Sequence, residues 1–200
     1  KEYYINDYGA QIINFTKSVF FRIREIKYNE KFNDDKDLYP GKYIIEIGKK
    51  IIDSNKDEKF DNFENSLEIL KKESLKHSMN LIKSDLKKLG IEHDKFFSES
   101  ELVESKLVDK AVNQLKKLDY VSYGYLQPPK GDVNENWKKT KRLIFKSTQF
   151  GDDTDRALQK NDGSWTYFAN DIAYHLNKVE RKYDYLINVL GADHTGYIKR

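Results

Sequence analysis

Two short stretches near the C-terminal end carry residue types that could bind a ligand. In the first, Tyr167 precedes Asp171 by four residues, within a segment of helical character from Trp165 to Leu176. Residues four apart lie on one face of a helix, so an aromatic ring with its hydroxyl and a carboxylate would face the same ligand. From these residues alone, a core tyrosine beside a solvated aspartate is the favoured interpretation.

The second stretch is an apolar segment that runs directly into glycine and polar residues. Residues 186–190 (Leu-Ile-Asn-Val-Leu) predict a buried, parallel strand, which hands over to Gly191, Ala192, Asp193 and His194. Open α/β sheets bind ligands in the crevice beyond the carboxyl ends of their strands. Asp193 could also be the N-cap of a following helix, and the two interpretations are compatible.

The rest of the chain supplies the elements that would position these residues. Helices are predicted where apolar residues recur at steps of three and four, strands where they alternate, and loops where Pro and Gly interrupt a polar stretch. The predicted helices cover residues 12–26, 43–52, 61–89, 98–115 and 165–176, the strands residues 3–5, 121–125, 143–145 and 186–190, and the loops residues 29–41 and 127–136.

Polar residues mark several ends of these elements. Asp61 and Ser98 each begin a capping box, with Glu three residues later. Gly90 follows the long helix as a C-cap, Asp7 could cap the first helix, and residues 161–163 (Asn-Asp-Gly) predict a hairpin-type turn. Residues 55–118 are charged and amphipathic, whereas both ends carry strands and glycines. This contrast indicates a helical insertion within an α/β domain.

Composition excludes several classes of protein. The 200 residues contain 36 Lys and Arg against 33 Asp and Glu, and this net charge of +3 is no nucleic-acid signature by itself. Cysteine is absent, which excludes disulfides and thiolate metal sites and suits a cytoplasmic protein. No apolar run is long enough to span a membrane. The only methionine is Met79, so we interpret the chain as an internal piece of a longer polypeptide, with a processed N-terminus as the alternative.

Other residue groups favour structural interpretations. The Asp-rich residues 151–155 lack the spacing of a calcium loop and predict a turn with capping and ion-pair roles, so no metal site is expected. His77 and His93 are expected on the surface or in helix packing. Ser164, His175 and Asp171 could be drawn as a triad, but no nucleophile elbow supports it. Phosphate-binding glycine motifs are also missing.

Three segments, in order, resemble arginyl-tRNA synthetases, the class I enzymes that charge tRNA with arginine. Residues 2–12 read E-Y-Y-I-N-D-Y-G-A-Q-I. Residues 147–156 read S-T-Q-F-G-D-D-T-D-R, followed by D-G-S-W-T-Y-F at 162–168 and D-I-A-Y-H at 171–175. Residues 191–197 read G-A-D-H-T-G-Y, with Thr195 where many relatives carry a second His. The resemblance covers most of the chain and is least distinctive in the helical middle.

The resemblance implies a fold, substrates and site residues. The fold would be α/β, part of a Rossmann-like class I synthetase catalytic core with a helical insertion: residues 1–54 the first part of the core, 55–118 the insertion and 119–200 the second part. Tyr167 and Asp171 would bind arginine, whose guanidinium suits a carboxylate. Gly191, Asp193 and His194 would lie on the adenosine side of ATP, whose counter-ion is Mg²⁺. The other partner would be tRNA(Arg), in the cytoplasm and without a membrane.

The chain carries neither of the two phosphate-binding motifs of class I synthetases, the HIGH-like and the KMSKS-like motif. These groups stabilise the charge that develops during phosphoryl transfer. The resemblance implies that the parent protein is an ATP-dependent arginine–tRNA ligase, and this piece alone is expected to be inactive because it lacks both motifs. The alternatives are a non-catalytic module that binds arginine or tRNA, or a truncated structural remnant.

Overall fold

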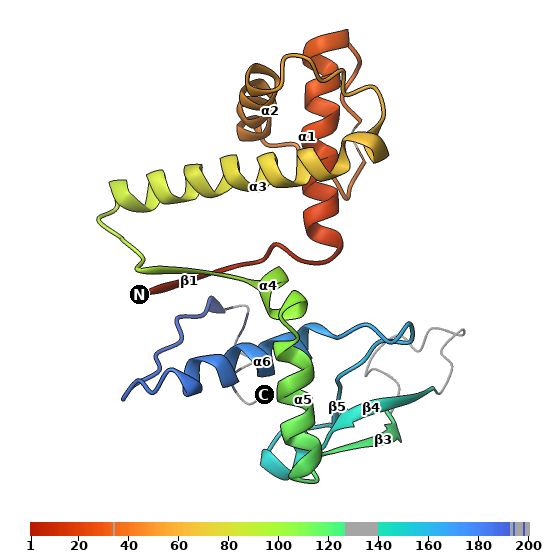
Figure 1. The fold of residues 1–200 in the computed structure, drawn as a ribbon, viewed down its shortest axis with the longest axis vertical. Helices are drawn as coiled ribbons and strands as arrows, with labels where there is room; N and C mark the ends of the chain where they lie inside the picture. Colours follow the sequence, from red (N-terminus) through yellow and green to blue (C-terminus); the bar gives the residue numbers. More distant parts are fainter. Residues whose placement is uncertain (34, 127–139, 193, 195–197, 199–200) are drawn as a thin grey trace. The chain divides into compact units, whose positions relative to one another are not determined.

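The computed structural model describes residues 1–33, 35–126, 140–192, 194 and 198, and it divides into two compact units, Lys1–Ser100 and Glu101–Arg200. Both units mix helices and strands (Figure 1), which confirms a mixed α/β protein. Among the described residues, no helix combines the length and the apolar character needed to cross a membrane.

The first unit is a pair of parallel strands joined through three helices. Strand β1 (Glu2–Ile5) pairs with β2 (Lys95–Ser98), with Tyr3 opposite Phe96. The crossover between them consists of α1 (Ala10–Tyr28), α2 (Lys42–Ser54) and α3 (Phe63–Lys88). The helices share one apolar core, to which each contributes residues at helical spacing. Its fully buried members are Val19, Ile23, Ile44, Ile47, Ile51, Phe60 and Leu70.

Helix α3 shows how local residues set its ends. Asn62 is the N-cap, and its side chain accepts a hydrogen bond from the Asn65 N–H at 3.0 Å. The predicted cap, Asp61, is therefore wrong by one residue. At the other end Gly90 adopts φ 71°, and the N–H groups of Gly90 and Ile91 bond the carbonyls of Lys87 and Leu86. This is a Schellman motif, so the predicted role of Gly90 is confirmed.

The second unit contains a small antiparallel sheet and two helices that pack together. The sheet has the order β3 (Val121–Tyr125), β4 (Lys141–Phe145) and β5 (Arg156–Ala157). Helix α4 (Glu99–Glu104) leads into α5 (Leu107–Lys117), which packs on α6 (Tyr167–Glu180). A 3₁₀ turn, η1 (Ser147–Phe150), follows β4. The predicted turn at 161–163 is confirmed, with Gly163 at φ 83°, whereas the predicted loop at 127–136 lies outside the described residues.

The predicted helix start at Ser98 is confirmed to within one residue, because Ser98 ends β2 and α4 begins at Glu99, but the predicted length of that helix is wrong. The Ser98 hydroxyl donates to the buried carboxylate of Asp7. The single helix predicted from there is two helices, since Lys106 adopts a left-handed conformation with φ 59°. Leu102 and Val108 are both fully buried. Six residues of an unbroken helix would place them on different faces, and the break allows both to be buried.

The predicted core strand at residues 186–190 is also wrong. These residues form no strand, and Ile187 and Val189 are 86% and 94% exposed. A strand satisfies its backbone N–H and C=O groups only by pairing with a neighbour, and none of the described strands pairs with this segment. This apolar segment therefore has no strand to pair with among the described residues.

Candidate functional site

Helix α6 presents the predicted pair of Tyr167 and Asp171. The helix begins after Thr166, whose side chain accepts from the Ala169 N–H. The Thr166 hydroxyl also donates to the Ala157 carbonyl at 2.8 Å, which ties the start of α6 to β5. Ala169 and Ala173 are buried on one side of the helix. Tyr167 and Asp171 lie one turn apart on another side, as predicted, with Tyr167 51% exposed.

Asp171 is half-buried, and burial raises the pKa of its carboxyl. The positive charges of Lys178 and His194 oppose this shift but do not cancel it. Within the described part of the chain, the Asp171 carboxylate has no hydrogen bond and no ion pair. Removing a carboxylate from water without a partner is unfavourable. A cation that reached this position would relieve that cost.

Lys178 is held by other groups instead of forming an ion pair with Asp171. Its Nζ donates to the Asn188 side chain at 2.7 Å and lies 4.4 Å from the centre of the Tyr174 ring. These contacts tie residues 186–190 to α6. The alternative triad is not assembled, because the Ser164 hydroxyl donates to Asp162 at 2.6 Å.

The residues predicted for the adenosine side are only partly described. Gly191 and His194 are exposed, and the His194 N–H bonds the Gly191 carbonyl at 2.9 Å. Asp193 lies outside the described residues.

The Asp-rich turn at 151–155 has the ion-pair and capping roles that we predicted. Both oxygens of Asp152 accept from the Arg156 guanidinium, at 2.7 and 2.6 Å, and this pairing holds the pKa of Asp152 far below its usual range. Asp155 accepts from the Thr148 N–H and hydroxyl. Across the described residues, no cluster of His, Asp or Glu has the arrangement of a metal site.

A polar junction that was not predicted from the sequence lies in the first unit, where β1 and β2 end. Asp7 is 5% exposed and accepts three hydrogen bonds, from the Ser98 hydroxyl and from the N–H and hydroxyl of Ser100, at 2.7–2.9 Å. It therefore stabilises the start of α4 instead of capping α1, whose N-cap is Gly9. The partners are more than 90 residues apart in sequence, so no local pattern could have paired them.

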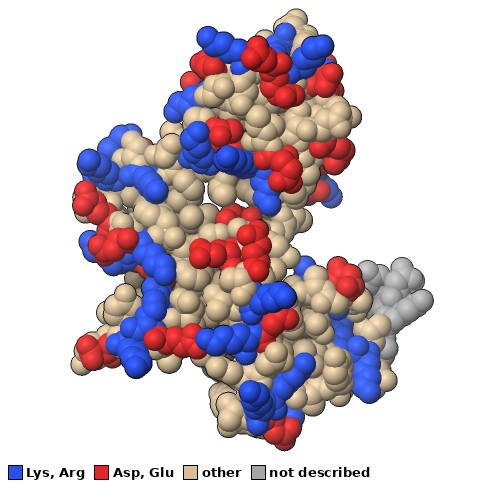
Figure 2. Space-filling model, in the orientation of Figure 1, with Lys and Arg blue, Asp and Glu red and all other residues tan. Residues whose placement is uncertain are grey.

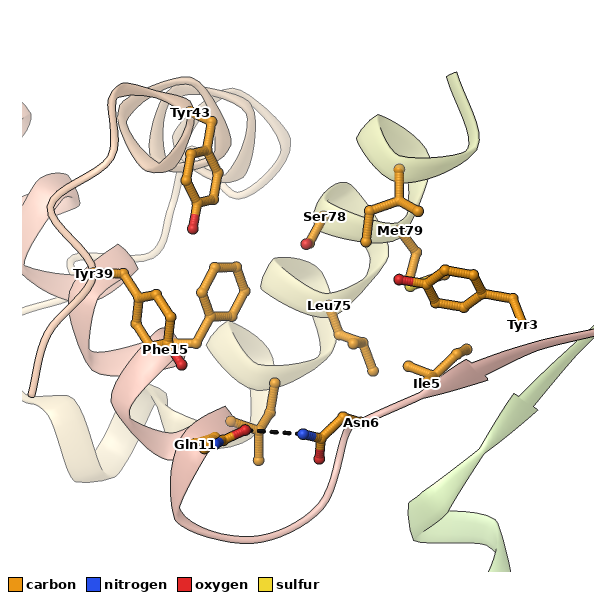
Figure 3. Close-up of a pocket in the computed structure, with 12 residues that line it drawn as sticks. Tyr3, Ile5, Asn6, Gln11, Phe15, Tyr39, Tyr43, Leu75, Ser78 and Met79 are labelled. Atoms are coloured by element: carbon orange, nitrogen blue, oxygen red, sulfur yellow. Dashed lines mark hydrogen bonds between the residues drawn. The ribbon is translucent and has the colours of Figure 1, made fainter. Parts of the chain in front are cut away.

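A cavity of about 240 Å³, which we call the aromatic–amide cavity, opens beside this junction between α3 and β1 (Figure 3). Four aromatic rings and two amides face it, and aliphatic side chains complete its walls. The Asn6 amide donates to Gln11 Oε1 at 2.8 Å. Burial, with a smaller effect of Tyr39, raises the pKa of Tyr43. The lining residues are Tyr3, Ile5, Asn6, Gln11, Ile12, Phe15, Tyr39, Tyr43, Leu75, Ser78, Met79 and Ile82.

Comparisons with known proteins agree with the resemblance seen in the motifs. All of the chain aligns with the arginine–tRNA ligases of Pelagibacter ubique at 59% identity and Ehrlichia chaffeensis at 48%, and in each case it covers 35% of the relative. A crystal structure from Campylobacter jejuni described as an arginyl-tRNA synthetase superposes on 99% of the chain with a TM-score of 0.81 and 29% identity, and 40% of that protein is covered. No protein-family model matches. The chain thus spans about a third of the length of its curated relatives, and its similarity to part of an arginyl-tRNA synthetase is confirmed.

Proposed function

We propose that this chain is the central part of the catalytic domain of a cytoplasmic arginyl-tRNA synthetase. The whole protein would activate arginine with ATP and transfer it to tRNA(Arg). Similarity to arginine–tRNA ligases along the entire chain carries the proposal. The half-buried, unpaired Asp171, one turn from Tyr167, supports it because it is suited to a cationic side chain.

In this proposal Asp171 accepts hydrogen bonds from the arginine guanidinium, a planar donor that pairs with both carboxylate oxygens. Tyr167 adds its ring face or its hydroxyl, which is available because the side chain is half exposed. The docked cation would lower the raised pKa of Asp171 and keep the carboxylate ionised. Lys178 does not compete, since Asn188 and Tyr174 hold its ammonium group.

The finer fold belongs to the same proposal. Residues 1–54 and 119–200 would be parts of a Rossmann-like core, and 55–118 a mainly helical insertion that contains β2. Residues 186–190 would be covered by other parts of the longer protein. Their exposed apolar side chains support this, since such an exposed run is unfavourable in water.

Gly191, Asp193 and His194 would lie on the adenosine side of ATP. Mg²⁺ would accompany the ATP phosphates. The groups that stabilise the phosphoryl transition state would come from outside these 200 residues, so we expect no arginine-dependent ATP–pyrophosphate exchange by this chain alone, even with tRNA present.

The experiment uses the full-length protein and compares Asp171→Asn with wild type. Losing one member of a charged, desolvated pair costs about 2–5 kcal/mol, or roughly 30-fold to several thousand-fold in affinity. We expect the arginine KM to rise by that factor while the ATP KM stays unchanged. Tyr167→Phe should have a smaller effect because its ring face remains.

Asp109→Asn is the matched control, since Asp109 is exposed on α5. If Asp171→Asn leaves the arginine KM within about twofold of wild type, Asp171 does not face the guanidinium. If the full-length wild type shows no exchange and no charging of tRNA, the protein is a non-catalytic module instead.

A further inference from the structure

The aromatic–amide cavity of the first unit has the composition of a site for a flat, uncharged group. Among the described residues that line it, none is charged at neutral pH. The guest that enters it should therefore be neutral, which argues against a phosphate, a carboxylate or a guanidinium. Aromatic walls with amide groups suit an unstacked nucleobase, which is recognised by stacking and by hydrogen bonds to its edge.

The amides of Asn6 and Gln11 have hydrogen-bonding groups that could bind the edge of a base. The bond from Asn6 to Gln11 uses one amide hydrogen of Asn6 and the oxygen of Gln11. An acceptor oxygen on Asn6 and a donor NH₂ on Gln11 therefore remain, and a donor beside an acceptor is the arrangement with which amide side chains bind bases. Figure 3 shows both amides at the turn from β1 into α1.

Tyr43 offers a ring for stacking. It is 46% exposed and makes no contact with another aromatic ring among the described residues, whereas Phe15 and Tyr39 pack edge to face at 5.8 Å. The Tyr43 ring lies over Gly41, where an added Cβ would come within 2.4 Å of the ring carbon Cε1. Because Gly41 has no side chain, the Tyr43 ring can lie beside the cavity.

A second cavity, which we call the basic cavity, lies beside the first and has the opposite character. Its volume is about 250 Å³, and Lys83, Lys87 and His93 line it together with one acidic residue, Glu92. The Lys83 ammonium lies 4.3 Å from the centre of the Phe96 ring. Leu86 and Ile91 complete the lining. Two lysines and an imidazole around a hollow suit a phosphate group.

A cluster of three rings separates the two cavities. Tyr3, which lines the aromatic–amide cavity, contacts His93 and Phe96 of the basic cavity at centroid distances of 5.5 and 5.7 Å. Along α3, Met79 lines the first cavity and Lys83 the second. Residues four apart are separated by about one helical turn, or about 6 Å, which is on the scale of one nucleotide along a strand. In Figure 2, Lys and Arg side chains gather at the end of α3 that leads to β2.

We infer that these two cavities form a site for an unpaired nucleotide of an RNA strand, with its base in the aromatic–amide cavity and a neighbouring phosphate at Lys83 and Lys87. The inference rests on the proposed function, because tRNA(Arg) is the RNA it implies. The place fits a ligand site, since the aromatic–amide cavity opens at the carboxyl end of β1, one of two parallel strands. The alternation of rings and basic groups is that of proteins that bind single-stranded nucleic acid.

The test measures the Kd of full-length protein for tRNA(Arg) by filter binding at several salt concentrations, and the KM for ATP on the same samples. Tyr43→Ala should weaken tRNA binding about 5- to 150-fold, the range for losing one base stack. Tyr43→Phe should bind within about twofold of wild type because the ring remains. Lys83→Gln should weaken binding and reduce the salt dependence by about one phosphate contact.

Two controls and one further variant accompany these changes. Tyr28→Ala removes a ring that is 43% exposed but lines neither cavity, and Lys88→Gln removes an exposed α3 lysine that is paired with Asp85. Both should bind tRNA like wild type. Ser78→Leu fills the aromatic–amide cavity from α3 and should weaken tRNA binding as Tyr43→Ala does, so the site is still tested if Tyr43→Ala fails to fold.

The outcomes distinguish a base of tRNA from the base of a free nucleotide. They also distinguish failure of this inference from failure of the proposed function. If the ATP KM rises while tRNA binding is unchanged, the cavity holds the base of free nucleotide and the inference is overturned. Wild-type tRNA affinity in both Tyr43→Ala and Ser78→Leu, in an enzyme that still charges tRNA, also overturns it. A wild-type protein that cannot charge tRNA with arginine refutes the proposed function instead.

Discussion

The helical core of the first unit and residues 186–190 of the second are about equally apolar, yet only the core is buried. Ile47 on α2 is 0% exposed, whereas Ile187 is 86% exposed. Helix α2 satisfies its backbone hydrogen bonds internally and needs neighbours only for its side chains. A strand needs a neighbour for its backbone as well. The described residues supply the side-chain neighbours that α2 needs, but they supply no strand to pair with residues 186–190.

The same difference explains where sequence and structure agree. Helices α1, α2 and α3 match their predicted ranges to within two or three residues, because steps of three and four and a glycine stop are local signals. Strand β3 was predicted from alternation and is confirmed, since β4 is present to pair with it. An alternating segment therefore shows that a strand is possible, and the pairing partner decides whether it forms.

The largest expected effect comes from a matched pair of substitutions in the 200-residue chain. Ile47→Ala removes buried side-chain atoms and leaves a cavity, so it should lower the free energy of unfolding by about 2–5 kcal/mol. Ile187→Ala should change it by less than about 0.5 kcal/mol, because the side chain is already in water. Urea denaturation followed by circular dichroism measures both.

The same two variants in the full-length protein sharpen the comparison. If other parts of that protein cover residues 186–190, Ile187→Ala should cost about as much as Ile47→Ala there. A negligible cost of Ile187→Ala in both proteins would contradict the proposal that this segment is covered in the longer protein.

The second prediction tests whether the ion pair between Asp152 and Arg156 stabilises the second unit. Arg156→Met would leave the carboxylate of Asp152, whose side chain is 5% exposed, without its guanidinium. Breaking a buried pair costs about 3–5 kcal/mol. Because 26% of the Arg156 side chain is exposed, water replaces part of the interaction, and we expect roughly 2–3 kcal/mol.

The pH dependence checks the cause. Arg156 lowers the pKa of Asp152, so this stabilisation is complete above the unfolded-state pKa of about 3.9 and is lost as the pH falls through the lower folded-state pKa. The deficit of Arg156→Met, measured by denaturation at several pH values, should therefore shrink in acid. A deficit that does not change down to about pH 2 would mean that lost packing, not lost charge, is responsible.

The candidate site was predictable where it depends on one helix and not where it depends on several elements. The shared face of Tyr167 and Asp171 follows from a spacing of four, and α6 confirms it. The burial of Asp171 depends on elements packed against α6, which no spacing reveals. Asp7 illustrates the same limit, because its three hydrogen bonds come from residues more than 90 positions away. The relative positions of residues on one helix can be predicted from sequence, whereas contacts between residues distant in the chain cannot.

The third prediction tests a local signal in the first unit. Gly90 ends α3 at φ 71°, and an added Cβ would meet no atom within 4 Å. Gly90→Ala should therefore cost only the backbone strain of a left-handed residue, about 1–2 kcal/mol. Gly90→Asn should recover part of it, since Asn tolerates this conformation. Equal stability of wild type and Gly90→Ala in thermal unfolding would show that α3 ends differently in solution.

The smallest expected effect concerns Asp171 itself, in the chain without arginine. Burial raises the pKa of its carboxyl, so the folded state favours the protonated form. This contribution to stability is complete below the unfolded-state pKa and is lost as the pH rises through the higher folded-state pKa. Asp171→Asn cannot ionise, so it should raise Tm by a few degrees at most at pH 7, with the difference vanishing in acid.

Thermal unfolding of wild type, Asp171→Asn and the exposed control Asp109→Asn across this pH range measures the effect, and only Asp171→Asn should show it. A lower Tm for Asp171→Asn at pH 7 would mean that the carboxylate already has a stabilising partner. A higher Tm together with a weakened arginine KM in the full-length protein has one physical explanation. In that case the fold would tolerate an unpaired, half-buried charge at Asp171 because the cation that pairs with it arrives with the substrate.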